Sequence, residues 1–263
     1  FKQRLQDYMI KALREAKCHT NWVAPNEAYE KATLVFIDRV LDADAGNGFL
    51  QEFLPFQKEI HAYGVYNSLS QVTLKMTCPG VPDFYQGTEL WDLSLVDPDN
   101  RRPVDFGLRS EMLAALNDTG REPSADLGPR LLASTEDGLV KLFLIRRLLH
   151  VRAAHPALFR EGDYVPLELA GPWARHAIAF LRRTEDTDVL VLVPRFVTAL
   201  VPGAEPPVGR TVWADTRVTL GDDASGLWYD AITGHVLKTD GGLLVGDMLH
   251  HFPVGLLLRH PLT

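Results

Sequence analysis

Apolar residues in the first part of the chain recur at helical spacing. The first stripe ends before His19 and has members three or four positions apart: Phe1, Leu5, Met9, Ala12, Leu13 and Ala16. Residues at this spacing share one side of a helix, so the stripe predicts a helix. The same reasoning predicts further helices over about 26–45, 56–76, 107–116 and 138–154.

Two of these helices have a recognisable apolar face. Asn26 is a candidate N-cap of the second helix, because its side chain can accept a hydrogen bond from the first turn. Ala32, Phe36 and Val40 then lie on one face of that helix. The apolar side of the helix over 56–76 carries Ile60, Tyr63, Leu69 and Val72.

After about Gly162 the pattern changes to short β-rich runs separated by Gly and Pro. The runs cover 164–169, 176–182, 189–193, 211–220 and 248–259. Residues 189–193 are apolar throughout, as in a strand covered on both faces, whereas apolar residues alternate over 252–258, as in a half-buried strand. Short strands at this spacing predict an antiparallel β-sandwich. The change of pattern places a boundary near 155–163, between a mostly helical part (1–160) and a β part (161–263).

Charge and composition exclude some classes of protein. The 263 residues include 27 basic and 34 acidic side chains, a formal charge of −7, with no Lys and Arg cluster of the kind that binds nucleic acid. The apolar runs are far shorter than the ~20 residues of a membrane-spanning helix. Cys18 and Cys78 are too few for a disulfide framework, so we expect reduced thiols and a cytoplasmic protein. The chain starts at Phe1 inside a helical pattern, which we interpret as part of a longer protein.

The first candidate site is the segment 79–89. Residues 81–86 are short and half apolar and predict one strand, after which Gly87 and Glu89 lie at the end of a sheet. In a β/α barrel that end carries the active-site loops. The alternative is structural: Tyr85 packs, Gly87 forms a turn and Glu89 accepts backbone hydrogen bonds. The residues by themselves favour this alternative.

The second candidate site is the loop 95–105, which is dense in planar hydrogen-bonding groups. It contains Asp97, Asp99, Asn100 and Arg101. Carboxylates and amides bind sugar hydroxyls, and guanidinium groups pair with carboxylates. The loop could equally satisfy its own polar groups through Asx turns and internal ion pairs, and both interpretations stay open.

Trp22, between the first two predicted helices, is a candidate platform for a sugar ring, although a Trp at a helix junction is more often a core residue. The chain contains no glycine-rich nucleotide loop and no Gly-x-Ser-x-Gly motif. His250 and His251 are neighbours in a predicted strand, so their side chains are expected on opposite faces and not on one metal ion. We expect neither a cofactor nor a metal.

These motifs resemble those of a known family. Residues 80–89 are similar to the segment at the eighth barrel strand of the α-amylase superfamily. The continuation through 90–105 resembles the maltooligosyl trehalose synthase family in particular. Shorter stretches resemble the same family: 14–17, 20–22, 67–71, 212–216 and 251–254. The resemblance therefore extends over nearly the whole chain.

The resemblance implies an α+β fold. Residues 1–160 are expected to form the C-terminal portion of a (β/α)8 barrel, mostly helical, with strand 8 and helix 8. Residues 161–263 are expected to form the antiparallel β-sandwich that follows. The family's three catalytic carboxylates belong to barrel strands four, five and seven, which would precede Phe1. We therefore expect no catalytic residue in this chain.

The activity implied by the resemblance is an intramolecular transglucosylation. The whole enzyme would convert the reducing-end α-1,4 linkage of a maltooligosaccharide to an α,α-1,1 linkage by a retaining double displacement. The expected substrate-binding residues are Trp22, Tyr85, Gln86, Asp97, Asp99, Asn100 and Arg101. The alternatives are a non-catalytic structural or sugar-binding module, or part of another superfamily member such as a glucanotransferase or an α-glucosidase. No nucleic-acid or membrane partner is expected, and the oligomeric state is left open.

Overall fold

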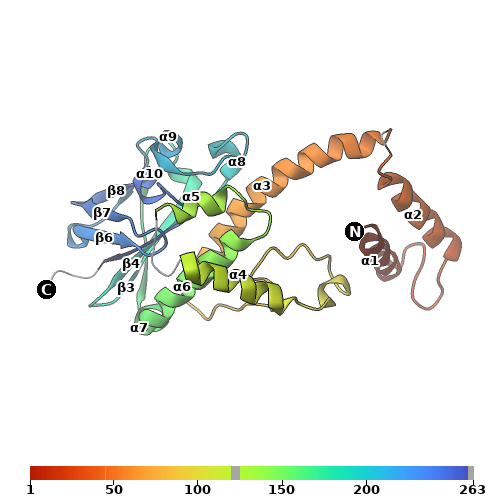
Figure 1. The fold of residues 1–263 in the computed structure, drawn as a ribbon, viewed down its shortest axis with the longest axis horizontal. Helices are drawn as coiled ribbons and strands as arrows, with labels where there is room; N and C mark the ends of the chain where they lie inside the picture. Colours follow the sequence, from red (N-terminus) through yellow and green to blue (C-terminus); the bar gives the residue numbers. More distant parts are fainter. Residues whose placement is uncertain (45, 120–124, 260–263) are drawn as a thin grey trace. The chain divides into compact units, whose positions relative to one another are not determined.

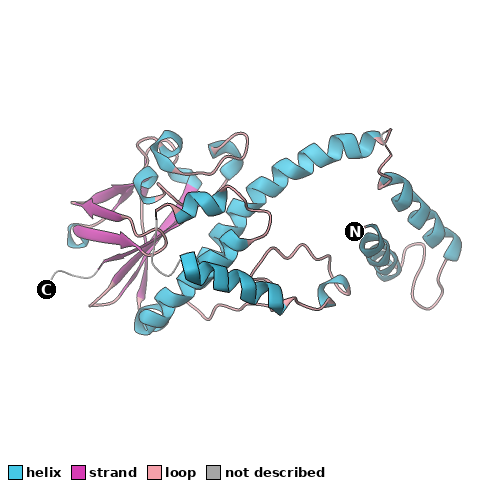
Figure 2. Cartoon of the chain, viewed as in Figure 1, coloured by secondary structure: helices cyan, strands magenta, loops and turns pink. Residues whose placement is uncertain are grey.

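The computed structural model describes residues 1–44, 46–119 and 125–259 and divides into two compact units. The first unit comprises Phe1–Ile60 and Asp92–Val104. The second comprises His61–Trp91 and the chain from Asp105 onward. Figure 1 labels the helices and strands, and Figure 2 shows that the strands belong to the C-terminal part of the described chain. The chain therefore combines helices with sheet, as predicted, while the division at residue 160 stays a prediction.

The first unit is built from helices and one loop. Helix α1 spans Lys2–Ala16, as the apolar stripe predicted, and α2 spans Glu27–Val40. The Asn26 side chain accepts a hydrogen bond from the Tyr29 N–H, so the predicted N-cap is confirmed. The loop of this unit contains a 3₁₀ turn, η1, at Asp99–Arg101.

The face of α2 that carries Ala32, Phe36 and Val40 is not the side of the helix that is buried. Phe36 is 65% exposed and Ala32 is also exposed, whereas Ile37 and Glu30 are the buried residues of this helix. Glu30 is buried because an ion pair with Arg14 holds it against α1. The orientation of α2 is therefore set by a charged contact that an apolar pattern does not report.

Helix α3 spans Gly48–Thr77 and contributes residues to both units. It begins earlier than the predicted 56–76 because the Asn47 side chain accepts a hydrogen bond from the Leu50 N–H at 3.2 Å, which caps a start ahead of Pro55. It ends, as predicted, before Cys78. Of its predicted apolar side Tyr63, Leu69 and Val72 are buried, while Ile60 is 50% exposed.

Buried polar groups of α3 connect it to the β part within the second unit. The Tyr63 hydroxyl donates to the Val201 carbonyl oxygen at 3.1 Å and the Ser70 hydroxyl donates to that of Pro194 at 3.0 Å. The Tyr63 oxygen also accepts hydrogen bonds from the N–H groups of Gly203 and Ala204. This helix is therefore held by specific hydrogen bonds as well as by apolar packing.

The other helices of the second unit are α4 (Phe106–Thr119), α5 (Leu127–Leu132), α6 (Leu139–Ala154) and α7 (Pro156–Glu161). The predictions over 107–116 and 138–154 are confirmed by α4 and α6. Helix α6 begins after Gly138, whose φ is +79°. A Cβ at this glycine would lie 3.0 Å from the Trp91 nitrogen. The start of α6 can therefore approach Leu90 and Trp91 this closely because the residue is glycine.

The β part contains two antiparallel sheets. The six-stranded sheet has the order β1 (Asp163–Pro166), β3 (Ala177–Arg183), β4 (Asp188–Pro194), β9 (Gly255–Arg259), β6 (Gly226–Asp230) and β7 (Val236–Thr239). The three-stranded sheet has the order β2 (Leu169–Ala170), β5 (Arg217–Thr219) and β8 (Gly242–Leu244). Short helical turns connect the strands: η2 (Ala174–His176), α8 (Val197–Leu200), α9 (Gly209–Trp213), η3 (Asp222–Ala224) and α10 (Val245–Met248).

The antiparallel strand pairs agree with the prediction, while packing of the two sheets as a sandwich stays a prediction. The expectation for 189–193 is confirmed, because all five side chains are 0% exposed. Other strand predictions are wrong in whole or in part. The run 164–169 is divided between β1 and β2, Thr211–Trp213 belongs to α9, and only Gly255–Arg259 of the run 248–259 is a strand.

The prediction of a strand over residues 81–86 is wrong altogether, because they form no strand. A strand needs a neighbour to satisfy its backbone groups, and none of the described strands pairs with this segment. The portion of a (β/α)8 barrel that the resemblance implies therefore stays a prediction.

Candidate functional site

The loop of the first unit is attached to α1 through Asp99, whose side chain is only 7% exposed. The Arg4 guanidinium donates to both Asp99 carboxylate oxygens at 2.7 Å and to the Leu93 carbonyl oxygen at 3.0 Å. The Leu95 N–H donates to the same carboxylate at 2.7 Å. The hydrogen bonds from Arg4 are the main reason that the pKa of Asp99 is lowered to about 2. Asp99 is therefore an ionised anchor of the loop at neutral pH.

Asp97 forms a second attachment of the loop to α1. The Lys11 ammonium donates to the Asp97 carbonyl oxygen at 2.5 Å and lies 3.5 Å from its carboxylate. The same carboxylate pairs with Arg101, whose side chain is 72% exposed. Asn100 is also exposed on η1. The ion pairs expected within the loop are present, Asp97 with Arg101 and Asp99 with Arg102, and α1 adds the contacts from Lys11 and Arg4. Asn100 and Arg101 are nevertheless exposed.

Trp22 lies in the loop between α1 and α2 and is 56% exposed, so it is not a core residue. The Arg14 guanidinium lies 5.0 Å from the Trp22 ring centroid and donates to both Glu30 carboxylate oxygens at 2.8 and 2.7 Å. Glu30 also accepts a hydrogen bond from the Thr20 hydroxyl at 2.6 Å. The bonds from Arg14 and then Thr20 lower the pKa of Glu30 to about 2. This ionised network holds the loop that presents the indole.

Tyr85 and Gln86 belong to the second unit, and both are exposed. After them the chain turns at Gly87, whose N–H donates to Glu89 at 3.0 Å. Arg109 of α4 fixes this turn by donating to the Glu89 carboxylate at 2.9 Å and to the Gly87 carbonyl oxygen at 2.6 Å. The structural interpretation is therefore confirmed for Gly87 and Glu89, but it is wrong for Tyr85, which is 58% exposed.

The sequence-based candidates do not include the basic residues that anchor them. Arg4, Lys11 and Arg14 lie seven and three residues apart, which places them along one side of α1. This spacing was the available signal, because basic side chains on one helix face opposite a loop rich in Asp are positioned to pair with it. Arg109 had no such signal, since its partner is the single carboxylate of Glu89, 20 positions away, and not a loop rich in Asp.

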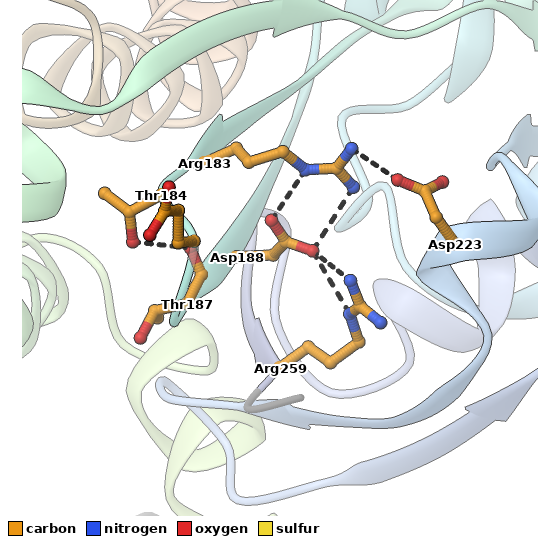
Figure 3. A pocket seen from close by; sticks show the side chains of 7 residues that line it. Arg183, Thr184, Thr187, Asp188, Asp223 and Arg259 are labelled. Atoms are coloured by element: carbon orange, nitrogen blue, oxygen red, sulfur yellow. Dashed lines mark hydrogen bonds and ion pairs between the residues drawn. The ribbon is translucent and has the colours of Figure 1, made fainter. Parts of the chain in front are cut away.

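A separate charged cavity of about 230 Å³ lies at the end of β4 in the second unit. In Figure 3 the Asp188 carboxylate lies between Arg183 and Arg259, and Arg183 also contacts Asp223. Both guanidinium groups therefore already have carboxylate partners. Because these charges pair with one another, we interpret the residues that line the cavity as a structural ion cluster, which stabilises the neighbouring ends of β3, β4 and β9.

The prediction for the histidine pair is corrected by the structure. His250 and His251 precede β9, which begins only at Gly255, so alternation along a strand does not separate them. Their ring centroids lie 4.3 Å apart, and that of His235 lies 5.7 Å from His251. Burial, and then the two neighbouring rings, lower the pKa of His251. Even so, no group of three His, Cys, Asp or Glu residues within 1–44, 46–119 and 125–259 is arranged to hold a metal ion.

No helix in the described part of the chain combines the length and the apolar character needed to cross a membrane. The two cysteines are free thiols, Cys18 exposed and Cys78 half-buried. The cytoplasmic location stays a prediction.

Comparison with solved structures defines the class of protein. The structure of maltooligosyltrehalose synthase from Arthrobacter ramosus aligns with 98% of this chain at a TM-score of 0.77 and 33% identity, and the alignment covers 30% of that chain. A further maltooligosyl trehalose synthase structure aligns with 98% of the chain at a TM-score of 0.72 and 28% identity. No family model matches the chain.

Comparison with curated proteins gives the same result. A protein of Mycobacterium tuberculosis described as a maltooligosyl trehalose synthase is 36% identical over 256 residues, or 97% of this chain. The chain is thus homologous to maltooligosyl trehalose synthases, which confirms the resemblance of its motifs. It spans 28% of the length of the curated relatives that it matches.

Proposed function

We propose that this chain is the C-terminal part of a maltooligosyl trehalose synthase, that it comprises the last part of the barrel and a β-sandwich, and that it supplies substrate contacts rather than catalytic groups. The observation that carries the proposal is the loop 92–104, which two basic residues of α1 hold in place while Asn100 and Arg101 stay exposed. Homology over nearly the whole chain supports the same assignment.

The chemistry of the whole enzyme would be a retaining transglucosylation from an α-1,4 to an α,α-1,1 linkage. Such a reaction needs a nucleophilic carboxylate and a carboxylic acid ~5–5.5 Å apart. Asp99 and Glu30 do not fit the acid role, because their pKa values are lowered to about 2 by guanidinium groups. These two carboxylates are therefore not proposed as the catalytic acid.

The released glucose has to stay bound, turn, and attack again before water does. Keeping it is a problem of positioning, which anchored hydrogen-bonding groups solve better than mobile ones. We propose that Asn100 and Arg101 donate hydrogen bonds to sugar hydroxyls and that Asp97 and Asp99 hold them in place. Trp22 is proposed to stack against a sugar ring. Tyr85 and Gln86, which belong to the other unit, are proposed separately as substrate contacts.

The test is the ratio of isomerisation to hydrolysis in the intact enzyme that contains this chain. Arg101→Ala is expected to raise the share of free glucose among the products, because the glucose is held less firmly. Arg160→Ala is the matched control, since Arg160 is 73% exposed and pairs with Glu161 much as Arg101 is 72% exposed and pairs with Asp97. An unchanged ratio for Arg101→Ala at normal stability would refute the role of this loop.

The absence of catalytic groups is tested on the chain alone. Incubation with maltopentaose is expected to give no non-reducing product, and any turnover would contradict the proposal.

A further inference from the structure

Phe196 is exposed on the surface of the β part and has a backbone conformation that is unfavourable for a bulky residue. It lies between β4 and α8, is 60% exposed, and has φ +53° and ψ 43°. A bulky residue with positive φ is strained, whereas glycine adopts the same conformation without cost. Because the exposed ring gains little from burial, packing does not explain why an aromatic residue occupies this position. A strained and exposed side chain of this kind points to a ligand.

Other aromatic and cationic groups surround this ring within the second unit. The Arg195 guanidinium lies 4.9 Å from the Phe196 ring centroid. The His176 ring meets Phe196 edge-on at 6.2 Å and meets Trp173 edge-on at 5.0 Å. We call Trp173, Arg175, His176, Arg195 and Phe196 the aromatic platform.

Hydrogen bonds fix the two segments that form the aromatic platform. The Arg195 N–H donates to the His176 carbonyl oxygen at 2.8 Å, and its Nε–H donates to that of Arg175 at 2.8 Å. The His176 Nδ1 atom lies 3.2 Å from the Phe196 carbonyl oxygen. The turn before β3 and the turn after β4 are therefore joined, so the rings are presented in a defined arrangement before any ligand binds.

The chemistry of the aromatic platform suits an uncharged sugar. Neither Arg175 nor Arg195 pairs with a carboxylate in the part of the chain that the structure describes, so both present N–H donors. Hydroxyl groups accept from such donors, while the C–H face of a pyranose packs on an aromatic ring. An anion would use only the donors and would leave the exposed Phe196 ring without a role.

We propose that the aromatic platform binds a glucose unit of a linear α-1,4-glucan. The general class of ligand follows from the platform itself, and the choice of α-1,4-glucan rests on the proposed function. Binding here adds affinity for longer glucans without taking part in the bond rearrangement.

The test measures binding of maltoheptaose to the chain by isothermal titration calorimetry, together with the melting temperature of each variant. Phe196→Gly is expected to weaken binding by about tenfold. Its melting temperature is expected to stay the same or rise, because glycine relieves the positive φ. Phe36→Ala, which removes a ring that is 65% exposed on α2, is the control and is expected to leave binding unchanged.

Three results would overturn the inference. They are no binding of maltoheptaose by the unaltered chain, unchanged binding by Phe196→Gly, and a clear fall in the melting temperature of Phe196→Gly, which would make the ring structural. If the unaltered chain binds a sulfated polyanion such as heparin but not maltoheptaose, the inference is overturned and the site is an anion site. The proposed function is judged separately, by trehalose-end formation from maltopentaose in the intact, unaltered enzyme, whose failure would refute that function and leave the maltoheptaose binding test as it stands.

Discussion

Arg182 is the buried cation on which several elements of the second unit converge. It lies on β3 and is 1% exposed. Its guanidinium donates to the carbonyl oxygen of Thr77, the last residue of α3, at 3.0 Å and to that of Leu158 in α7 at 3.1 Å. It also donates to the carbonyl oxygens of Phe159, Gly162 and Asp163 at 3.3, 2.7 and 3.3 Å. Replacing Arg182 therefore tests whether this cation holds the ends of two helices to the sheet.

The expected loss follows from these contacts. A hydrogen bond from a charged donor contributes about 1.5–3 kcal/mol, but the five bonds share one guanidinium and are not additive. Burial also lowers the pKa of Arg182, which shows that desolvating the cation opposes its contribution. We expect Arg182→Met to lower the free energy of unfolding by about 3–5 kcal/mol. For a unit of this size that corresponds to a fall in melting temperature of about 10 °C.

The assay is thermal unfolding followed by near-ultraviolet circular dichroism, which reports on the fully buried Trp213 and Trp228. Arg182→Lys is expected to fall between the unaltered protein and Arg182→Met, because an ammonium keeps the charge but reaches fewer carbonyl groups. Arg210→Met is the control, since Arg210 is 65% exposed and pairs with Asp247. A melting temperature for Arg182→Met within about 2 °C of the unaltered protein would refute the reasoning.

Two further predictions concern buried carboxylates of the β part. Asp188→Ala leaves Arg183 and Arg259 without their shared partner and should lower the free energy of unfolding, measured in urea, by about 3–5 kcal/mol. The control is Asp223→Ala, at a side chain that is 64% exposed, which should lower it by less than about 1 kcal/mol. Equal losses for the two variants would contradict the argument from burial. Burial raises the pKa of Asp230 from 3.8 to about 6, so the folded state keeps a proton that the unfolded state releases. Stability should therefore fall as the pH rises from about 4 to about 6 and stay level above that. Asp230→Asn should remove this fall, and parallel stability curves for the two proteins would count against it.

Elements that depend on their own residues were predictable from the sequence. The stripe from Phe1 to Ala16 predicted α1, and Asn26 caps α2 because its side chain reaches an N–H three residues away. The run 189–193 predicted a strand covered on both faces. In each case the deciding pattern lies within a few residues of the element that it forms.

Elements that depend on distant partners were not predictable in this way. Residues 81–86 have the composition of a strand, yet none of the described strands pairs with them. Trp213 was expected in a strand, but its indole N–H donates to the Pro207 carbonyl oxygen at 2.9 Å within the turn that contains α9. His250 and His251 gather beside His235 because the chain bends before β9.

The candidate site also combines features that local residues determine with features that distant partners determine. The sequence by itself identified a loop of Asp97, Asp99, Asn100 and Arg101 and related it to maltooligosyl trehalose synthases, because motifs and residue types are local properties of a chain. The tertiary structure alone decided which of these groups are available. Asp99 is held by Arg4, some 95 positions away in the sequence, whereas Arg101 stays exposed. The sequence likewise allowed Trp22 to be either a core residue or an exposed residue that stacks on a sugar ring. The packing of the neighbouring helices decided that it is exposed, because burial depends on contacts that no short stretch of sequence contains.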